Sequence, residues 1–378
     1  MLLISDIGGT NGRLQLWDPS SPNPALVFSA TLAPSSFPCL ELMLREFLAA
    51  AALPSPARIR LAVLAVCGPT WSEGRFNESN NIPRWCPPGR SVSFHDASAL
   101  EAALGWAPST LHFINDFEAV GFGVVSLLGG GGGASAPAAP RCLRAATGGA
   151  PPPPCAAPAA CVGAGTGLGA CVIAPPREGG FADAAVIPSE AGMADTISPR
   201  TELEWRLLQH LRSGGAGFAE VERVVSGPGV VEIFFFLQAD SAPGAGDASA
   251  AAVAEEVRAA PEEARGAVIA RHARLAAEGH GGGGGALCLA AVDLFLTFYG
   301  RFLTTAAMTH LCYNGLFIAG GILPKLAWRE GVLLAAFADA GPKMGDTVGR
   351  VPLFLLEDAD CGLKGALFFA LRLLKECD

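Results

Sequence analysis

The residues best suited to chemistry gather at three glycine-rich turns, each of which follows a short apolar run. The first turn, residues 6–13, reads DIGGTNGR. Paired glycines let the backbone turn tightly with its N–H groups toward an anion, and hydroxyl and amide side chains add donors. A purely structural hairpin is an equally common use of Gly-Gly, but an acid beside a phosphate loop often holds Mg²⁺ through water. We therefore predict phosphate contacts from Gly8, Gly9, Thr10 and Asn11, with Asp6 toward the metal.

The second turn, residues 163–169, reads GAGTGLG and lies between two apolar runs. It lacks the Gly-Lys-Ser/Thr of a Walker A loop, and a strand rather than a helix follows it, which excludes the dinucleotide fingerprint. Together with the first turn it predicts two β-hairpins that grip a polyphosphate from opposite domains, here through Gly165, Thr166 and Gly167. The third turn ends the run FIAGGI at residues 317–322, where Gly320 and Gly321 suit close packing against adenine or ribose.

A carboxylate ends a further apolar run, at Ile114-Asn115-Asp116. Ligands of open α/β sheets bind at the carboxyl ends of strands, so Asp116 is placed to act as a general base. The alternative interpretation is that Asn115 or Asp116 caps a helix that starts near Glu118, because Asn and Asp are common N-cap residues. From these residues alone both interpretations are equally acceptable.

The elements that must position these side chains follow an α/β pattern. Strands are expected at residues 2–4, 14–17, 60–66, 112–114, 161–162, 170–173, 316–319 and 352–356. Helices are expected at residues 40–52, 118–128, 199–212, 229–237 and 286–312. Two stretches, residues 129–160 and 238–285, are rich in Gly, Ala and Pro and indicate loops or linkers that bury little core. A helix over 250–277 is an option, but we favour a solvent-exposed insertion.

Composition limits the classes of protein. With 378 residues, 51% of them hydrophobic, the chain exceeds one small module and is too apolar to be disordered. The net charge of −9 argues against nucleic acid and anionic membranes as partners. Eleven scattered cysteines without a C-x-x-C pair predict free thiols in a cytoplasmic protein and no zinc site. The uncharged stretch 302–324 is broken by Asn-Gly and Gly-Gly, which favours a buried helix and strand over a membrane span.

Read together, the motifs resemble the bacterial type of glucokinase, within the hexokinase, actin and sugar-kinase superfamily. The resemblance rests on six segments in the family's order across nearly the whole chain: DIGGTNGR at 6–13, FINDFEAV at 113–120, GAGTGLG at 163–169, IPSEAG at 187–192, ERVVSGPG at 222–229 and FIAGGI at 317–322. The two low-complexity stretches lie outside it.

The resemblance implies an α/β fold, the two-domain actin-like ATPase (ribonuclease H-like) fold with a cleft between the domains. It implies a small domain of residues 1–113 plus 360–378 and a large domain of residues 114–359. The implied activity is ATP-dependent phosphorylation of the glucose 6-hydroxyl, the first step of glycolysis, with ATP, Mg²⁺ and glucose as the small-molecule partners; a homodimer is an option.

The resemblance also assigns roles. Asp116 would be the base that takes the proton of the 6-hydroxyl, and Asn115, Glu190 and Glu222 would bind sugar hydroxyls. Apart from the resemblance, the alternative interpretation is that Glu190 is a solvated acid in a loop and that Glu222 is an exposed charge in the first turn of a helix. A Val at Gly167 would be expected to weaken ATP binding and leave sugar binding intact.

The chain departs from the family at one sugar ligand. The family usually has Glu-Gly-Gly-His where this chain has Glu190-Ala191-Gly192-Met193, so a thioether replaces an imidazole. A family Asn-x-x-Trp stretch is matched only with a displaced Trp85, which leaves Asn81 unassigned. Met193 and the insertions motivate a second hypothesis, a catalytically weak sugar-binding or regulatory protein on the same fold. The retained Asp116 and both phosphate hairpins favour the enzyme.

Overall fold

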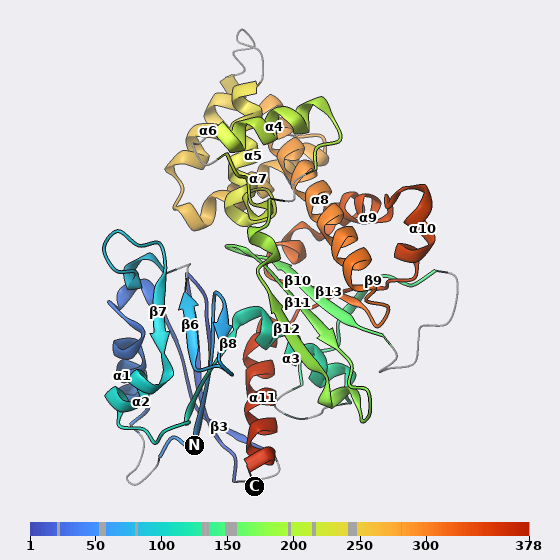
Figure 1. Ribbon diagram of the computed structural model, residues 1–378. Helices are drawn as coiled ribbons and strands as arrows, with labels where there is room; N and C mark the ends of the chain where they lie inside the picture. The colour runs from blue at the N-terminus through green and yellow to red at the C-terminus, as the bar shows by residue number, and fades with distance from the viewer. Residues whose placement is uncertain are drawn as a thin grey trace.

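The fold is built on two larger β-sheets with helices between and around them (Figure 1). The computed structural model describes residues 1–20, 23–52, 58–79, 82–130, 133, 136–147, 157–195, 198–213, 217–240, 248–280 and 282–377.

The first sheet has the strand order β3-β2-β1-β4-β8. Its members are β1 (Leu2–Ile7), β2 (Gly12–Asp18), β3 (Ala25–Leu32), β4 (Leu61–Val66) and β8 (Leu111–Asn115). Strands β1, β4 and β8 are parallel, so their carboxyl ends meet at one edge, while β1, β2 and β3 form an antiparallel meander. The runs LLI in β1 and LAVLAV in β4 are buried throughout, as strands covered on both faces require.

Helices and a small sheet cover this first sheet. Helix α1 (Leu40–Ala51) packs Met43, Leu44 and Phe47 against one face. Helix α2 (Ala97–Leu104) follows a three-stranded antiparallel sheet of β5 (Thr70–Trp71), β6 (Phe76–Ser79) and β7 (Ser93–Asp96).

The second sheet has the order β12-β11-β10-β13-β14-β9. Its strands are β9 (Arg141–Arg144), β10 (Ala159–Ala164), β11 (Leu168–Ala174), β12 (Ala185–Ser189), β13 (Leu316–Ala319) and β14 (Leu353–Leu355). Strands β10 and β11 form the hairpin that carries the second glycine turn, and β13 runs parallel to β10.

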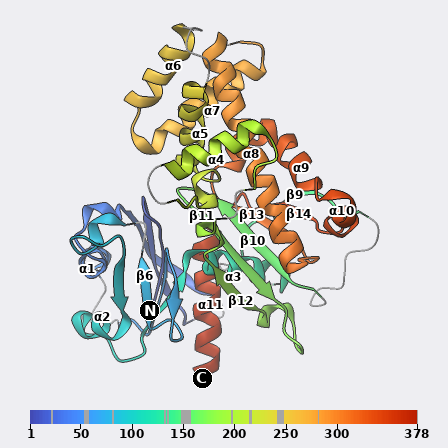
Figure 2. The ribbon, with the colours of Figure 1, turned by 45° about the horizontal axis from the view of Figure 1, so that its top comes forward.

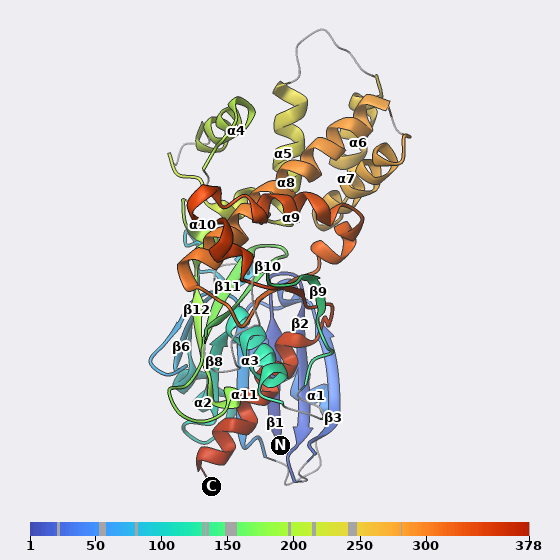
Figure 3. The ribbon, with the colours of Figure 1, turned by 90° about the vertical axis from the view of Figure 1, so that its right-hand side faces the viewer.

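Two helices lie between the sheets and join them. Helices α3 (Asp116–Leu128) and α11 (Cys361–Cys377) pack side by side, as Figures 1 and 3 show. One apolar cluster contains residues of β1, β4, β10, β11, α3 and α11. The two helices approach closely because Gly365 leaves room for the α3 backbone, where a Cβ would collide with the Ala119 carbonyl. The two sheets therefore share one core through this helix pair.

The remaining helices gather at the far end of the second sheet (Figures 1 and 2). They are α4 (Glu202–Ser213), α5 (Gly227–Asp240), α6 (Ala248–Ala259), α7 (Glu262–Ala277), α8 (Gly282–His310), α9 (Glu330–Ala338) and α10 (Gly341–Gly349). Among the described residues, α8 alone is long and apolar enough to span a membrane, but 56% of its most apolar window is buried inside the protein. As expected for stretch 302–324, α8 ends at His310 and a buried strand, β13, follows.

All eight expected strands and all five expected helices are present, although their ends shift; α3 begins at Asp116 rather than near residue 118. The interpretation of the low-complexity stretches is wrong in two places. Residues 248–277 form α6 and α7, whose Val253, Val257 and Ile269 are buried against α5 and α8, since the alanines of this stretch favour helix. Within 129–160, β9 pairs with β14 and β10 begins at Ala159.

Several elements were not expected: β3, β5, β6, β7, β9, β12, α2, α9, α10 and α11. No disulfide joins the nine cysteines whose side chains the structure describes. The domain boundaries at residues 113, 114, 359 and 360 stay a prediction, because α3 and α11 contact both sheets.

Candidate functional site

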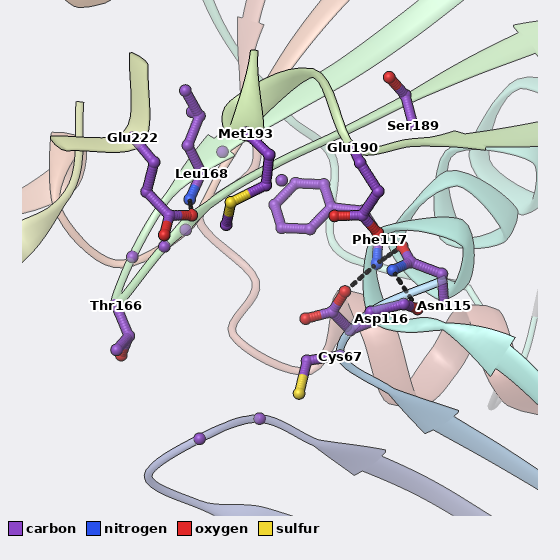
Figure 4. A pocket seen from close by; sticks show the side chains of 18 residues that line it. Cys67, Asn115, Asp116, Phe117, Thr166, Leu168, Ser189, Glu190, Met193 and Glu222 are labelled. Atoms are coloured by element: carbon purple, nitrogen blue, oxygen red, sulfur yellow. Dashed lines mark hydrogen bonds between the residues drawn. The ribbon is translucent and has the colours of Figure 1, made fainter. Parts of the chain in front are cut away.

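A cavity of about 200 Å³ lies where the two sheets face each other (Figure 4). Elements that are far apart in the sequence line this cavity. The first sheet contributes the β1–β2 turn, the end of β4 and the β8–α3 junction. The second sheet contributes the β10–β11 hairpin, the end of β12 and the end of β13, and a short 3-10 helix (Val221–Arg223) completes the lining. Ten predicted site residues line it: Gly8, Gly9, Asn115, Asp116, Gly165, Thr166, Gly167, Glu190, Glu222 and Gly320.

Asn115 is the N-cap of α3 and is buried. Its Oδ1 accepts hydrogen bonds from the N–H groups of Phe117 (2.8 Å) and Glu118 (3.2 Å), and its Nδ2 donates to the Gly68 carbonyl at 3.0 Å. A side-chain amide offers two acceptor sites and two N–H donors. With three used in the described part of the chain, one N–H is left for a ligand. The capping interpretation is therefore correct for Asn115 and leaves room for a binding role.

Asp116 is the first residue of α3 and is half-buried in the wall of the cavity. Its Oδ1 accepts a hydrogen bond from the Phe117 N–H at 2.9 Å. Burial, reinforced by the negative charges of Asp6 and Glu190, raises the pKa of Asp116 to about 7. A general base works best when its pKa lies near the working pH, so this carboxylate is suited to accept a proton at neutral pH.

The glycines of the β10–β11 hairpin make room for neighbouring side chains. A Cβ at Gly163 or Gly169 would collide with the ring of Phe117, which lies against the hairpin beside the base. Gly165 has no protein atom near its missing Cβ, and Thr166 at the tip is exposed. The turn is closed by a 2.8 Å hydrogen bond from the Gly165 N–H to the Gly167 carbonyl. The open side of the hairpin at Gly165 and Thr166 is thus available to a ligand.

Glu222 reaches this hairpin from the 3-10 helix Val221–Arg223. Its Oε2 accepts a 2.7 Å hydrogen bond from the Leu168 N–H, shown in Figure 4. Burial raises the pKa of Glu222. A Cβ at Gly167 would collide with the same carboxylate, so added bulk there would displace Glu222 as well as alter the turn. The expectation that it weakens ATP binding alone stays a prediction.

After β12, Glu190 precedes a second 3-10 helix, Ala191–Met193, and Met193 is its last residue. Burial of its carboxylate in the cavity, together with the charge of Glu222, raises the pKa of Glu190, although the residue as a whole is exposed. Met193 points into the cavity between Glu190 and Glu222 (Figure 4). Asp195, which could have replaced the missing imidazole, is instead ion-paired with Arg212 at 2.9 Å.

Four predicted residues, Asp6, Thr10, Asn11 and Gly321, are not in the lining of the cavity. Asp6 accepts a hydrogen bond from Arg13 and lies against the start of α11 at Gly362. Thr10 and Asn11 are exposed at the tip of the β1–β2 turn, which a 3.0 Å hydrogen bond from the Gly8 N–H to the Asn11 carbonyl closes. Gly321 is exposed. Position 320 requires glycine, because its φ is +88° and a Cβ there would collide with the Ala164 carbonyl.

Sequence reasoning missed Cys67, Gly68 and Phe117 as lining residues. The signal was available for two of them, because Cys67-Gly68 ends the buried run of β4 as Asn115 ends that of β8. Asn80 and Asn81 lie outside the described residues.

Comparisons with known proteins point to one family. The family model of glucokinase matches residues 3–373. A glucokinase from Synechocystis sp. is 31% identical over 377 residues, which cover 96% of this chain and 96% of that protein.

This chain belongs to the glucokinase family. The predicted family and enzyme class are thereby confirmed. Two solved structures are similar in fold. One is glucokinase from Balamuthia mandrillaris in complex with glucose, with a TM-score of 0.71 and 20% sequence identity; the match covers 98% of this chain and 93% of that one. The other is a ROK family glucokinase from Streptomyces griseus in complex with glucose and AMPPNP, with a TM-score of 0.60 and 16% identity; the match covers 98% of this chain and 99% of that one. The two-domain actin-like ATPase fold expected for a glucokinase is confirmed as well.

Proposed function

We propose that this glucokinase-family chain transfers the γ-phosphoryl group of ATP to the 6-hydroxyl of glucose, giving glucose 6-phosphate and ADP in the first step of glycolysis. The observation that carries the proposal is the half-buried Asp116, with a pKa raised to about 7 by burial and nearby acids, in a cavity lined by glycine turns from both sheets. A catalytically weak regulatory protein would have no need of both the base and the two hairpins.

Asp116 acts as the base. Its carboxylate takes the proton of the sugar 6-hydroxyl while that oxygen bonds to the γ-phosphorus and the bond to the β,γ-bridging oxygen breaks. ADP leaves with the bonding electron pair. Phosphoryl transfer depends mainly on positioning and charge stabilisation, so one base in a shaped cleft is sufficient machinery.

The sugar subsite is formed by Asn115, Glu190 and Glu222. Asn115 has one N–H left to donate, and the two glutamates offer carboxylate acceptors to sugar hydroxyls. A sugar that lacks a matching hydroxyl leaves one of these groups unpaired, and that cost provides selectivity.

The phosphates lie between the β1–β2 turn and the β10–β11 hairpin. We assign Gly8, Gly9, Gly165, Thr166 and Gly167, which line the cavity, to phosphate contacts, and Gly320 to the nucleoside. Thr10, Asn11 and Gly321, which are exposed outside the lining, would join them at the rim.

Mg²⁺ fits the carboxylates present at this site. The described residues contain no cluster of three metal-ligating side chains, and Mg²⁺ commonly uses one or two carboxylates together with water and substrate phosphates. Asp6 lies outside the cavity lining and is paired with Arg13, but its charge acts on Asp116, and it would hold the ion through water. When bound, Mg²⁺ supplies neutralisation of phosphate charge.

Further parts of the proposal concern organisation. We assign residues 1–113 plus 360–378 to one domain and 114–359 to the other, with a cytoplasmic location, no nucleic-acid or membrane partner, and a homodimer as the assembly to test. The small number of basic residues, 26 against 35 acids, supports the absence of polyanionic partners.

A coupled assay of ADP release over a panel of hexoses tests the activity. Glucose-dependent release in the wild type, lost in an Asp116→Asn variant that still binds glucose by calorimetry, is the expected result. Glucose binding without glucose-dependent ADP release in the wild type would favour the regulatory protein.

A further inference from the structure

The carboxylate of Glu118 lies directly behind the proposed sugar subsite. Its Oε2 accepts a hydrogen bond of 3.2 Å from the backbone N–H of Asn115, while the Glu118 N–H donates to Asn115 Oδ1. This reciprocal pair is a capping box, which here joins the first turn of α3 to the end of β8.

The capping box settles which way the Asn115 amide is turned. With Oδ1 held by the helix, Nδ2 must face the other way, where it donates to the Gly68 carbonyl at 3.0 Å. Gly68 and Asn115 both line the cavity. The remaining N–H of Asn115 is therefore presented to the cavity from a backbone position that the Glu118 carboxylate helps to hold, through its hydrogen bond to the Asn115 N–H.

Burial of the Glu118 carboxyl is not compensated by a cation. In the described part of the chain no salt bridge reaches it, and burial raises its pKa to about 7. Burying an acid without a basic partner is unfavourable. Glu118 is half-buried at the junction of β8 and α3, where its carboxylate fixes the backbone N–H of Asn115.

We propose that Glu118 is a positioning residue for glucose, acting through Asn115; the inference rests on the proposed function. It touches neither substrate nor the reacting atoms. The prediction is specific to the sugar. Removing the carboxyl leaves the Asn115 backbone N–H without its acceptor and loosens the β8–α3 junction that carries the Asn115 side chain, so glucose binds more weakly while the phosphate hairpins are undisturbed.

The test compares steady-state KM values for glucose and ATP, with calorimetry for glucose. In Glu118→Ala we expect the glucose KM and Kd to rise about fivefold to tenfold, the scale of weakening one hydrogen bond to the sugar, with the ATP KM within about twofold of wild type. Glu118→Gln keeps an acceptor oxygen and should restore near wild-type glucose binding. Glu118→Asp is one methylene too short to reach Asn115 and should resemble Glu118→Ala.

A matched control separates positioning from helix stability. Asp96 caps α2, accepting hydrogen bonds from the N–H groups of Ser98 and Ala99, and is not in the lining of the cavity. Asp96→Ala should lower the melting temperature without a change in glucose KM. Glu118 also borders a separate cavity of about 470 Å³, in which water can replace a truncated side chain, so the variants are expected to fold. Should Glu118→Ala fail to fold, Glu118→Asp makes the same comparison.

The outcomes are distinguishable. Unchanged glucose KM in the folded Glu118→Ala or Glu118→Asp variant, with an active wild type, overturns the inference alone. A glucose defect in Glu118→Gln as large as in Glu118→Ala also overturns it, because the acceptor would then not matter. A wild type that does not phosphorylate glucose overturns the proposed function, and with it the subsite on which the inference rests.

Discussion

Glu222 and Leu168 join the proposed sugar subsite to the phosphate hairpin: the Glu222 Oε2 atom accepts a 2.7 Å hydrogen bond from the Leu168 N–H. The same carboxylate lies where a side chain at Gly167 would begin. If the hairpin holds the phosphates and Glu222 the sugar, as proposed, a displacement of the hairpin would also displace the sugar-binding carboxylate. This contact gives a structural reason for binding of sugar and nucleotide to depend on each other.

Gly167→Ala is the first test of that dependence. Its Cβ would displace Glu222, so we expect the KM values for glucose and ATP both to rise, by about tenfold, a loss typical of a broken hydrogen bond to a charged group. Gly165→Ala is the contrasting variant, because no protein atom lies within 4 Å of its added Cβ. It should raise the ATP KM alone. A Gly167→Ala enzyme with an unaltered glucose KM would contradict the prediction.

Replacing Asp116 by Ala should abolish most of the phosphoryl transfer while the fold persists. A positioned base contributes about a hundredfold to ten-thousandfold in rate, and kcat should fall on that scale. Circular dichroism and glucose calorimetry on the same preparation check that structure and binding remain. Turnover within a few-fold of wild type would mean that another group takes the proton.

The pH dependence of kcat/KM should show one acidic limb. The pKa of Asp116 is raised to about 7, and only the deprotonated carboxylate can accept a proton, so activity should fall as the pH drops below about 7. Glu118 also has a pKa raised to about 7. The variant Glu118→Gln separates the two acids: the limb should persist in it. Loss of the limb in Glu118→Gln would assign the titration to Glu118 instead.

The parts of the fold that the sequence predicted are those with strong local patterns. Continuous apolar runs such as β4 and β10 end in Gly, Asn or Asp, and these patterns located both the strands and the cavity. The β5–β7 sheet was missed because its strands have only two or four residues, too few to give a clear alternation of apolar and polar side chains. The role of Glu118 was also missed. The spacing of Asn115 and Glu118 is typical of a capping box, but only the fold shows that this box lies behind a residue of the cavity wall.

Helices α6 and α7 were misjudged because the Gly- and Ala-rich composition of residues 238–285 was given more weight than the spacing of their apolar residues. Ile269 on α7 is fully buried in the core around α5 and α8. Ile269→Ala should therefore destabilise the protein by about 2–5 kcal/mol, as large-to-small changes in a core do. Leu275, on the same helix but 39% exposed, supplies the control, and Leu275→Ala should cost about 1 kcal/mol or less. Equal, small shifts in urea midpoint for the two variants would show that α7 does not contribute to the core.

Met193 offers the sharpest test of the sugar subsite, because it is where the chain departs from its family. Its side chain points into the cavity between Glu190 and Glu222, and Asp195 is paired with Arg212 and so does not stand in for an imidazole. A thioether accepts hydrogen bonds weakly and cannot donate them. Met193→His should thus add a hydrogen bond worth about 1 kcal/mol and lower the glucose KM several-fold, with kcat little changed. The matched control is Met193→Leu, which keeps the volume without a donor and should leave KM close to wild type. An unchanged or higher KM in Met193→His would mean that position 193 does not meet a sugar hydroxyl, and that Asn115, Glu190 and Glu222 hold the sugar without it.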